Sequence, residues 1–366
     1  MNSSNPVGVG VIGAGKISDQ YLTQLTSYPD LRVHIVSDAI AERAAAQATK
    51  YHVMQSGSVE DALTHPDVEI IVNLTIPASH SEISRAALIA GKHVWTEKPF
   101  ALDRETGRAL VDLAREKGLR IGCAPDTFLG AGLQTARRMI ERGDIGVPQS
   151  ALTLFETPGP GPKHHNLEVL LSKGAGPLFD MGPYYFTALV QTFGSVESVV
   201  ATARTARPRR DWEREGREVV ANVPTNVSVL SLFEGGQMGT SIFSWDSPIR
   251  RDGWVEVTGT EATIAVPDPN RFDGDVRLKR LGEDEWITVP SSGAASGRGV
   301  GTLEIARAVR DHRPHRASPE LAYHVLDVLI SATESLDSGS LVDVNSSASP
   351  AEILPEDWDP HSVTLR

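Results

Sequence analysis

Short apolar runs alternate with helix-compatible stretches over the first 125 residues of the chain. The runs that we expect to form strands are residues 7–12, 31–36, 69–74, 93–96 and 119–122. Alanine-rich stretches with helical periodicity lie between them, at residues 40–51, 80–90 and 104–117. This alternation of strand and helix at short spacing predicts a parallel, doubly wound sheet, and hence an α/β fold.

The pattern changes after about residue 150, where β-rich runs predominate. Helical patterns remain at residues 182–193, 302–310 and 319–336. The runs expected to be strands are residues 196–205, 226–233, 237–245, 254–259, 263–266, 276–279 and 286–289. Turn sequences such as Glu234-Gly235-Gly236 separate these runs, which predicts an α+β domain with a large, mostly antiparallel open sheet. The basic run Arg207-Pro208-Arg209-Arg210 is interpreted as a solvated loop between two strands.

The chain length favours two domains. At 366 residues it exceeds one ordinary domain and suits two. From the change in pattern we expect one domain over residues 1–125 and a second over residues 126–345. Residues 346–366 contain serine and proline with little periodicity, so we expect them to form a C-terminal tail.

The composition narrows the class of protein. Charged residues make up 22% of the chain and the formal net charge is −12, which argues against general nucleic-acid binding. Cys123 is the single cysteine, so an intrachain disulfide is excluded. The first residues show no basic segment followed by an apolar stretch, and no run approaches the ~18 apolar residues of a membrane span. We therefore expect a cytoplasmic protein that binds neither nucleic acid nor membrane.

A glycine-rich turn follows the first expected strand. Gly13-Ala14-Gly15 joins that strand to a helical pattern, which is the context of a dinucleotide-binding turn. Gly13 would permit the tight turn, and Gly15 would let the backbone approach a pyrophosphate at the start of the helix. Ser18 stands where the usual motif has a third glycine. Because an ordinary loop can also contain such glycines, the prediction needs a second feature.

Asp38 supplies that second feature. It follows the second expected strand and lies 23 residues after Gly15, close to the spacing of about 20 residues to the acid that binds a ribose 2′-hydroxyl. The alternative is that Asp38 caps the helix that follows it. No arginine directly follows Asp38 to receive a 2′-phosphate, so the sequence favours NAD over NADP as the cofactor.

Three further segments together resemble one family of oxidoreductases. Pro77 and His80 form a P-x-x-H loop after the third strand. The segment GKHVWTEKP occupies residues 91–99, and GAGPLFDMGPYY occupies residues 174–185. With the Gly13-Ala14-Gly15 turn, their order and spacing resemble the glucose–fructose oxidoreductase, inositol dehydrogenase and rhizopine catabolism (Gfo/Idh/MocA) family up to about residue 340. The resemblance implies an NAD(P)-binding Rossmann fold for the first domain, and substrate binding and oligomerisation for the second.

The resemblance also implies roles for residues of the first domain. Lys98 would be a catalytic residue that points at the substrate oxygen, and Glu97 would hold the ribose on the nicotinamide side. The cofactor-binding residues would be Gly13, Gly15, Lys16, Ile17, Asp38, Thr75, Pro77, His80, Glu97 and Lys98. A lysine in a dry cleft beside a cationic nicotinamide has a reason for a lowered pKa, which suits stabilising an alkoxide. The alternative for Lys98 is a surface ion pair with Glu97.

Asp180 and Tyr184 are the catalytic candidates of the second domain. They lie four residues apart at the start of an expected helix, so their side chains share one face. The family pattern there is Asp, three residues, then His, so Tyr184 departs from it and points away from a typical inositol dehydrogenase. The alternatives are a helix N-cap for Asp180 and core packing for Tyr184. Tyr185 is expected to face elsewhere.

His164 is a further candidate for substrate binding, with Lys98, Asp180 and Tyr184. It follows a Pro/Gly-rich loop, at a position similar to one that contacts sugar in family members. No HxxxH motif or cysteine cluster completes a metal site with the His164-His165 pair, so no catalytic metal is expected. Asp126 is interpreted either as a cofactor or substrate contact or as a cap for the helix at Gly130.

These residues predict an NAD-dependent oxidoreductase that moves a hydride between nicotinamide and a secondary alcohol or ketone of a sugar, cyclitol or sugar derivative. The alternatives are a ketoreductase, an enzyme whose NAD stays bound through the cycle, and a non-catalytic dinucleotide-binding sensor. A sensor needs the glycine turn and Asp38 but no proton-transfer group. The apolar strands at residues 227–233 and 237–245 also predict a covered outer sheet face, and hence a homodimer or homotetramer.

Overall fold

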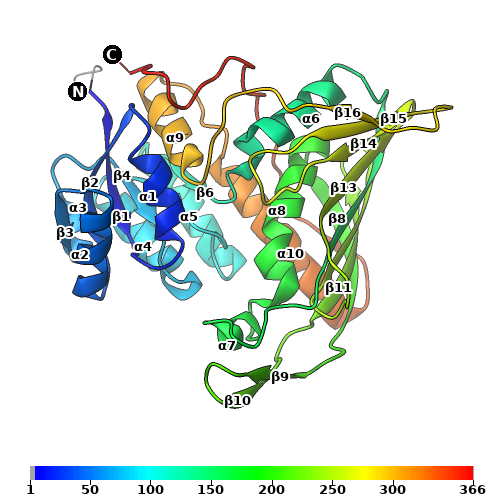
Figure 1. The fold of residues 1–366 in the computed structure, drawn as a ribbon, viewed down its shortest axis with the longest axis horizontal. Coiled ribbons are helices and arrows are strands. Elements are labelled where there is room, and N and C mark those ends of the chain that lie inside the picture. The colour runs from blue at the N-terminus through cyan, green and yellow to red at the C-terminus, as the bar shows by residue number, and fades with distance from the viewer. Residues whose placement is uncertain (1–4, 366) are drawn as a thin grey trace. The chain divides into compact units, whose positions relative to one another are not determined.

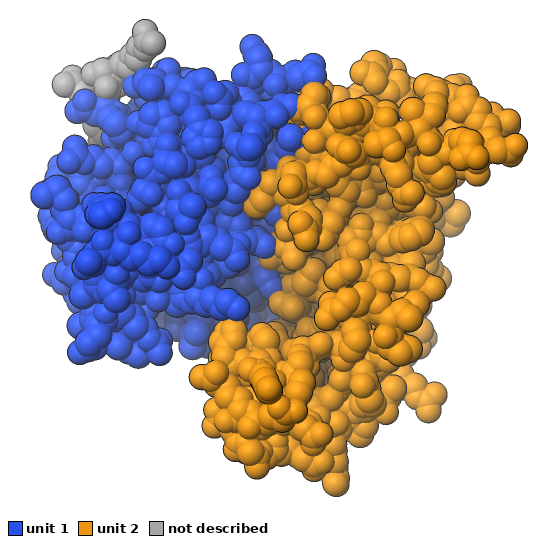
Figure 2. Space-filling view, viewed as in Figure 1, with its two compact units in different colours: residues 1–131, 293–326, 354–366 blue, residues 132–292, 327–353 orange. Residues whose placement is uncertain are grey.

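The computed structural model describes residues 5–365 (Figure 1). They divide into two compact units, which Figure 2 shows in different colours. The described part of unit 1 is residues 5–131, 293–326 and 354–365, and unit 2 is residues 132–292 and 327–353. Within residues 5–365, no helix combines the length and apolar character needed to cross a membrane.

Unit 1 is built on a six-stranded parallel sheet in the order β3-β2-β1-β4-β5-β6. Its strands are β1 (Val7–Ile12), β2 (Leu31–Ser37), β3 (Gln55–Gly57), β4 (Ile70–Asn73), β5 (His93–Thr96) and β6 (Ile121–Cys123). β1, β4 and β6 are buried along their whole length, as expected of a parallel sheet covered on both faces. The chain moves outward from β1 in both directions, which confirms the predicted doubly wound α/β fold.

β3 is the one strand of this sheet that the sequence pattern does not predict. It has three residues, two of them exposed, and none has a large apolar side chain. It forms because β2 offers backbone partners: Ile35, Val36 and Ser37 lie opposite its three residues. A hydrophobic pattern detects burial, and this short edge strand has little of it.

Helices α1 to α5 lie between strands of the unit 1 sheet, and two later helices belong to the same unit. They are α1 (Ser18–Leu25), α2 (Ala41–Lys50), α3 (Val59–Thr64), α4 (Pro77–Ile89), α5 (Arg104–Glu116), α9 (Val300–Arg310) and the first part of α10 (Pro319–Ser338). A short 3₁₀ turn, Thr127–Leu129, follows β6. Side-chain caps fix two helix starts: Ser58 accepts from the Asp61 amide, and Asp103 accepts from the Thr106 amide.

Unit 2 is built on a nine-stranded sheet in the order β16-β15-β14-β13-β7-β12-β11-β8-β17. The strands are β7 (Pro148–Glu156), β8 (Val196–Arg204), β11 (Asn226–Phe233), β12 (Met238–Ser244), β13 (Arg251–Gly259), β14 (Ala262–Val266), β15 (Val276–Arg280), β16 (Ile287–Val289) and β17 (Val342–Asp343). β7 and β12 are parallel, and the other paired strands of the described sheet are antiparallel. This confirms the predicted large, mostly antiparallel sheet.

β7 is central in this sheet, yet the sequence pattern does not single it out. Its inward, buried positions hold Ala151, Thr153 and Phe155, whereas Leu152 points outward and is partly exposed. A large apolar residue therefore lies on the outer face, and a threonine lies on the inner face. The Thr153 hydroxyl donates a hydrogen bond to the Ser241 hydroxyl. The alternation is too weak to predict a strand from hydrophobicity alone.

The helices of unit 2 are α6 (Ala131–Glu141), α7 (Leu167–Leu170), α8 (Gly176–Phe193) and the later part of α10. α8 packs against β7, β11 and β12. Tyr185 lies in this packing, with ring contacts to Phe155 and Phe243. The sheet and α8 therefore enclose the core of unit 2.

The interpretation of the basic run as a solvated loop is correct only in part. Arg207 and Pro208 are exposed and lie outside any strand, whereas Arg209 and Arg210 begin a hairpin. β9 (Arg209–Trp212) pairs with β10 (Arg217–Val220) in a two-stranded antiparallel sheet. The Arg210 side chain is mostly buried and donates to Asp246 Oδ1 at 2.6 Å. Asp246 neutralises the buried guanidinium, and such a tertiary partner is invisible in the local sequence.

The compact units differ in extent from the domains expected at residues 1–125, 126–345 and 346–366. Residues 293–326 and 354–365 pack with unit 1. Arg307 donates from Nε to Asp30 Oδ2 at 2.8 Å, and both side chains are buried. Thr364 and Leu365 donate their amides to the same carboxylate. These long-range bonds give the apparently patternless C-terminal residues a defined place.

Asp30→Asn should lower the free energy of unfolding by about 3 kcal/mol at neutral pH, because it leaves the Arg307 guanidinium buried without its counter-charge. Burial acts to raise the pKa of Asp30, but bonds from Thr364, Leu365 and Arg307 outweigh it and lower that pKa. The carboxylate therefore adds stability above its unfolded pKa of about 4, and loses it as the pH falls through the folded value. The gap between wild type and variant in urea unfolding should shrink below about pH 4.

Asp112→Asn is the matched control. Asp112 pairs with Arg115 at 3.5 Å on the surface of the same unit, where an ion pair contributes less than about 1 kcal/mol. Equal losses of stability in the two variants would show that the Asp30 cluster is not a structural anchor.

Candidate functional site

The register of the parallel sheet brings the candidate residues of unit 1 to one edge. Ser37, Ile12, Asn73, Thr96 and Cys123 are opposite one another across five adjacent strands. The next residue in each segment therefore leaves the sheet at the same level. Those residues include Asp38, Gly13 and Glu97, which the sequence names as candidates. This carboxyl edge is where open parallel sheets bind their ligands.

Gly13 and Gly15 differ in what a side chain at each position would meet. Gly13 has φ +108°, and a Cβ there would lie 2.6 Å from the Leu74 carbonyl. A Cβ on Gly15 would meet no protein atom within 4 Å. Packing therefore requires glycine at residue 13, whereas at residue 15 it leaves room for a ligand to approach the backbone.

Asp38 holds the glycine turn against the end of β2. Its Oδ2 accepts from the Ala14 amide at 2.7 Å, and its Oδ1 accepts from the Ile40 amide at 2.8 Å. The second bond closes a turn just before α2, whose N-cap is Ile40 and has no side-chain cap, so the capping alternative for Asp38 is wrong. Lys16 is exposed and Ile17 is half-buried at the beginning of α1, next to this turn.

The loop after β4 is anchored by two buried polar residues. The Asn73 amide donates to the His80 carbonyl at 2.9 Å, and its oxygen accepts from Thr75. The His80 ring lies between two carbonyl oxygens, with Nδ1 2.9 Å from Pro99 and Nε2 3.0 Å from Thr75. His80 thus joins this loop to the segment after β5. Pro77 is exposed at the first turn of α4.

Glu97 is held on both carboxylate oxygens. Oε1 accepts from the Tyr21 hydroxyl at 2.7 Å, and Oε2 accepts from the Lys98 amide at 3.1 Å. Glu97 is buried, whereas Lys98 is half-buried. The Lys98–Pro99 peptide bond is cis. Sequence reasoning missed Tyr21 and Asn73, because nothing in the local sequence marks either residue as a hydrogen-bond partner.

Asp126 anchors the return of the chain to unit 1. It is fully buried, and its Oδ2 accepts from the amides of Gly299 and Gly301 at 2.8 and 3.0 Å. Burial raises the pKa of Asp126 to about 6, against the lowering effect of these amides and Arg298. Asp126 therefore holds the start of the distant helix α9, and its side chain does not cap the turn that follows it, Thr127–Leu129.

Asp180 and Tyr184 both lie within α8 of unit 2, as predicted. The helix begins at Gly176, so Asp180 is inside it and is not its N-cap. Asp180 is half-buried and Tyr184 is buried. The Tyr185 hydroxyl accepts from the Gly253 amide at 2.9 Å, and its ring packs on Phe155 and Phe243 in the core of unit 2.

His164 lies in a loop that the β9–β10 hairpin holds. Its carbonyl accepts from Trp212 Nε1 at 2.7 Å, and its ring stacks on His165 with centroids 4.5 Å apart. Arg217 of the same hairpin forms an ion pair with Glu168 of α7 at 2.6 Å. The hairpin therefore positions the one histidine that the sequence proposes for substrate binding.

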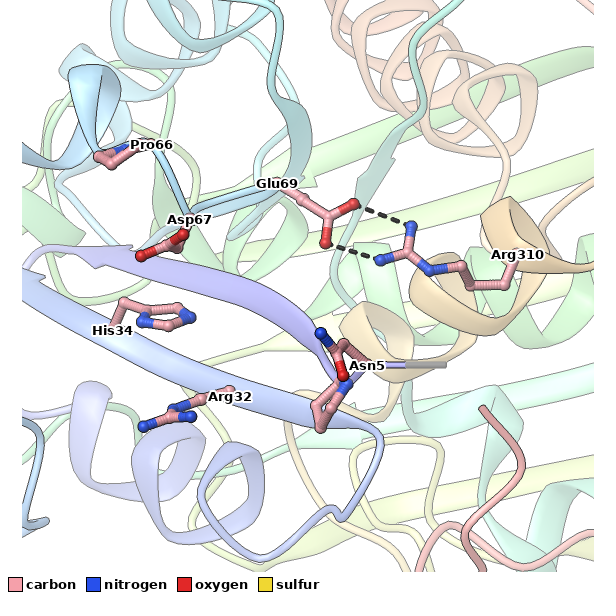
Figure 3. Close-up of a pocket in the computed structure, with 8 residues that line it drawn as sticks. Asn5, Arg32, His34, Pro66, Asp67, Glu69 and Arg310 are labelled. Carbon is pink, nitrogen blue, oxygen red and sulfur yellow. Dashed lines mark hydrogen bonds and ion pairs between the residues drawn. The ribbon is translucent and has the colours of Figure 1, made fainter. Parts of the chain in front are cut away.

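A separate polar pocket lies at the opposite, amino edge of the unit 1 sheet (Figure 3). Its volume is about 660 Å³, and its walls include Arg32, His34 and Asp67. Arg310 closes one side through a two-point ion pair with Glu69 at 2.7 and 2.8 Å. His34 and Asp67 also lie with His65 in the one group of possible metal ligands among residues 5–365, with ligand atoms up to 4.8 Å apart. None of the predicted nucleotide residues is in this pocket.

Comparison with known protein families identifies both parts of the chain. Residues 7–124 match the oxidoreductase family with an NAD-binding Rossmann fold, abbreviated Gfo/Idh/MocA. Residues 133–265 match the C-terminal domain of the same family. The chain belongs to the Gfo/Idh/MocA oxidoreductase family. The resemblance read from the EKP and GAG segments is thereby confirmed.

Individual members of this family act on different compounds. D-xylose dehydrogenase of Paenarthrobacter nicotinovorans is 26% identical over 74% of this chain and 76% of its own length. Trans-1,2-dihydrobenzene-1,2-diol dehydrogenase of Bos taurus is 26% identical over 82% of this chain and 87% of its own. The structure of levoglucosan dehydrogenase with NADH and L-sorbose has a TM-score of 0.81 at 22% identity, covering 93% of this chain and all of that one. The structural likeness shows a shared fold.

Gly13→Ala and Gly15→Ala should separate folding from ligand binding. Gly13→Ala strains the backbone and meets the Leu74 carbonyl, so it should lower the melting temperature by several degrees. Gly15→Ala meets no protein atom, so it should melt within ~2 °C of wild type yet bind NADH at least about tenfold more weakly. Thermal unfolding and NADH fluorescence titration measure the two effects. Wild-type NADH affinity in Gly15→Ala would place the nucleotide elsewhere.

Proposed function

We propose that this oxidoreductase is an NAD-dependent dehydrogenase acting on a secondary alcohol of a sugar, cyclitol or sugar derivative. The observation that supports this most is Lys98, half-buried at the carboxyl end of β5 and hydrogen-bonded through its amide to the buried Glu97. Relatives named for D-xylose and for a dihydrodiol support a hydroxylated substrate. The reaction would break the carbinol C–H and O–H bonds, with the hydride going to nicotinamide C4 and the proton to the protein.

The residues of the carboxyl edge suit NAD. The space beside Gly15 suits a pyrophosphate, and the Asp38 carboxylate lies next to the turn, where a ribose hydroxyl can donate to it. Asp38 is held by two backbone amides, so it cannot easily turn away from an added phosphate. When bound, the nicotinamide would supply the hydride acceptor; the protein supplies orientation and the proton path.

Three side chains would share the proton chemistry. Lys98 would stabilise the alkoxide and help deprotonate the hydroxyl, and Tyr184 would be its proton-transfer partner. Asp180 would orient substrate hydroxyls, and His164 would contact the substrate. Tyrosine has a reference pKa of about 10, so it is a poor base alone, but a neighbouring ammonium lowers that value. Lysine and tyrosine therefore make chemical sense as a pair.

The remaining alternatives differ in chemistry. The same residues would serve ketone reduction, and an enzyme that retains its NAD would be silent when only alcohol is added. A panel of cyclitols, hexoses and glycosides, preceded by native mass measurement for bound NAD, distinguishes these. A non-catalytic sensor would have no use for Lys98 and Tyr184.

We also propose a homodimer or homotetramer formed through the outer face of the large sheet. β13, β7, β12 and β11 are adjacent, and their exposed apolar residues are Leu152, Leu230, Leu232, Met238 and Trp254. A patch of this kind usually marks an interface. Sedimentation should show an oligomer at micromolar concentration, and Leu230→Lys with Met238→Lys should shift it to monomer. Leu281→Lys, on a more exposed leucine outside these strands, is the control; a monomeric wild type contradicts the proposal.

Asp38→Ala should narrow the preference for NAD over NADP. In the wild type, a 2′-phosphate beside the Asp38 carboxylate would cost a few kcal/mol in repulsion and desolvation. Fluorescence titration of both reduced cofactors should therefore show tighter NADH binding, with the ratio falling at least about tenfold in the variant. Equal or tighter NADPH binding by the wild type would refute the assignment.

Lys98→Met should cut turnover by roughly two to four orders of magnitude and leave NAD affinity within about threefold, because general acid–base help is lost. Tyr184→Phe should also slow turnover, more steeply below neutral pH if a tyrosinate is the base. Tyr185→Phe is the matched control in the adjacent core position and should keep turnover within about threefold. Full activity of Tyr184→Phe across the pH range would make Tyr184 a packing residue, with His164 or water as the next proton path.

A further inference from the structure

We propose that Tyr21 is a positioning residue for Lys98 and acts through the carboxylate of Glu97. The inference rests on the proposed function of Lys98. It concerns a bond between α1, which follows the glycine turn, and the segment after β5. Two successive hydrogen bonds, through the Glu97 carboxylate, link the helix after the glycine turn to the backbone of Lys98.

The Tyr21 hydroxyl is fixed as a donor to Glu97. Tyr21 is fully buried on α1, and its hydroxyl donates to Glu97 Oε1 at 2.7 Å. The same hydroxyl oxygen accepts from Trp95 Nε1 at 3.2 Å. Trp95 is itself buried, and a Cβ on Gly301 would lie 2.2 Å from its ring, so the indole has little room to move. The Tyr21 hydroxyl therefore accepts one hydrogen bond, from Trp95, and donates its proton to Glu97.

Glu97 transmits this constraint to the peptide of Lys98. Its second oxygen, Oε2, accepts from the Lys98 amide at 3.1 Å, and its own amide donates to the Asn73 carbonyl at 2.9 Å. The carboxylate is thus bound at each end, between a side chain of α1 and the backbone at which Lys98 begins. Losing the Tyr21 bond would leave Oε1 buried without that donor, and the carboxylate would no longer be fixed at both ends.

The charges around Tyr21 keep its hydroxyl protonated. Burial, followed by the negative charges of Glu97 and Asp126, raises the pKa of Tyr21 well above its ordinary value. Arg298 opposes this effect from the α9 side. Glu97, Lys98 and Asp126 also influence the buried thiol of Cys123, whose pKa is raised chiefly by burial. Tyr21 therefore remains a hydrogen-bond donor throughout the neutral pH range, and does not itself exchange protons with a substrate.

Tyr21→Phe tests this role while keeping the buried ring. We expect kcat to fall about 10- to 100-fold, the usual scale for a small misplacement of a reacting group, while the KM for substrate and the Kd for NADH stay within about threefold. Tyr28→Phe is the matched control, because Tyr28 is an equally buried tyrosine of unit 1 whose hydroxyl lies beside the Gly297 backbone. Its kcat should stay within about twofold of wild type.

Chemical labelling of Lys98 provides a second measurement that does not depend on turnover. The Glu97 carboxylate holds the backbone amide of Lys98, so loss of the Tyr21 hydrogen bond should loosen the segment at which the Lys98 side chain begins. Acylation of Lys98 by an amine reagent in cofactor-free protein, followed over time by mass spectrometry, should therefore be faster in Tyr21→Phe than in wild type. Tyr28→Phe should leave the labelling profile of Lys98 unchanged.

Glu97→Gln keeps the experiment decisive if Tyr21→Phe folds poorly. A carboxamide offers one acceptor oxygen, so it can keep only one of the two bonds that Glu97 makes. We expect the same loss of kcat, and we expect Tyr21→Phe to add less than about twofold in the Glu97→Gln background. Additive losses, or a Tyr21→Phe variant that matches Tyr28→Phe in kcat and in Lys98 labelling, would overturn the inference.

The outcomes separate this inference from the proposed function. If Lys98→Met retains turnover, the role of Lys98 fails whatever Tyr21→Phe does. If Lys98→Met is inactive and Tyr21→Phe behaves as wild type, Lys98 keeps its role and only the positioning by Tyr21 is refuted.

Discussion

The shared register of five parallel strands is the constraint on which the unit 1 site depends. Ser37, Ile12, Asn73, Thr96 and Cys123 align across the sheet, so the loops that follow them begin at a common edge. Their free backbone and side-chain groups must then find partners among one another, because this edge is largely buried. Asn73, His80 and Glu97 supply those partners. The fold of unit 1 therefore brings these polar groups together without any ligand.

The buried polar groups divide into those that hold the edge and those that remain for a ligand. The residues that hold the edge form hydrogen bonds with backbone groups of neighbouring loops; they are Asn73, His80 and Asp126. Gly15 and Lys16 remain half-buried and exposed, respectively, beside the turn. The hydrogen bonds of Glu97 place it among the residues that hold the edge. The family resemblance implies that it also binds a ribose. Its carboxylate keeps further lone pairs, so a second role is compatible with the observed bonds.

The sequence predicts most of the strands because parallel, buried strands read as continuous apolar runs. It misses β3, β7, the β9–β10 hairpin and the two-residue β17. β3 lacks large apolar residues, and β7 turns Leu152 outward. The glycine turn, Asp38 and the EKP segment are found because their chemistry is local. Tyr21 and Asp30 are not, because their partners are 76 and 277 residues away in the sequence. Pairings of that range follow only from the fold.

The central claim is that the carboxyl edge of the unit 1 sheet receives the dinucleotide. Hydrogen exchange of backbone amides, with and without saturating NADH, tests it most directly. We predict slower exchange at residues 13–18, 75–80 and 97–98 on adding NADH, and unchanged exchange at residues 32–34 and 65–69 beside the pocket of Figure 3. Protection confined to that amino-edge pocket, with no change at the glycine turn, would contradict the account.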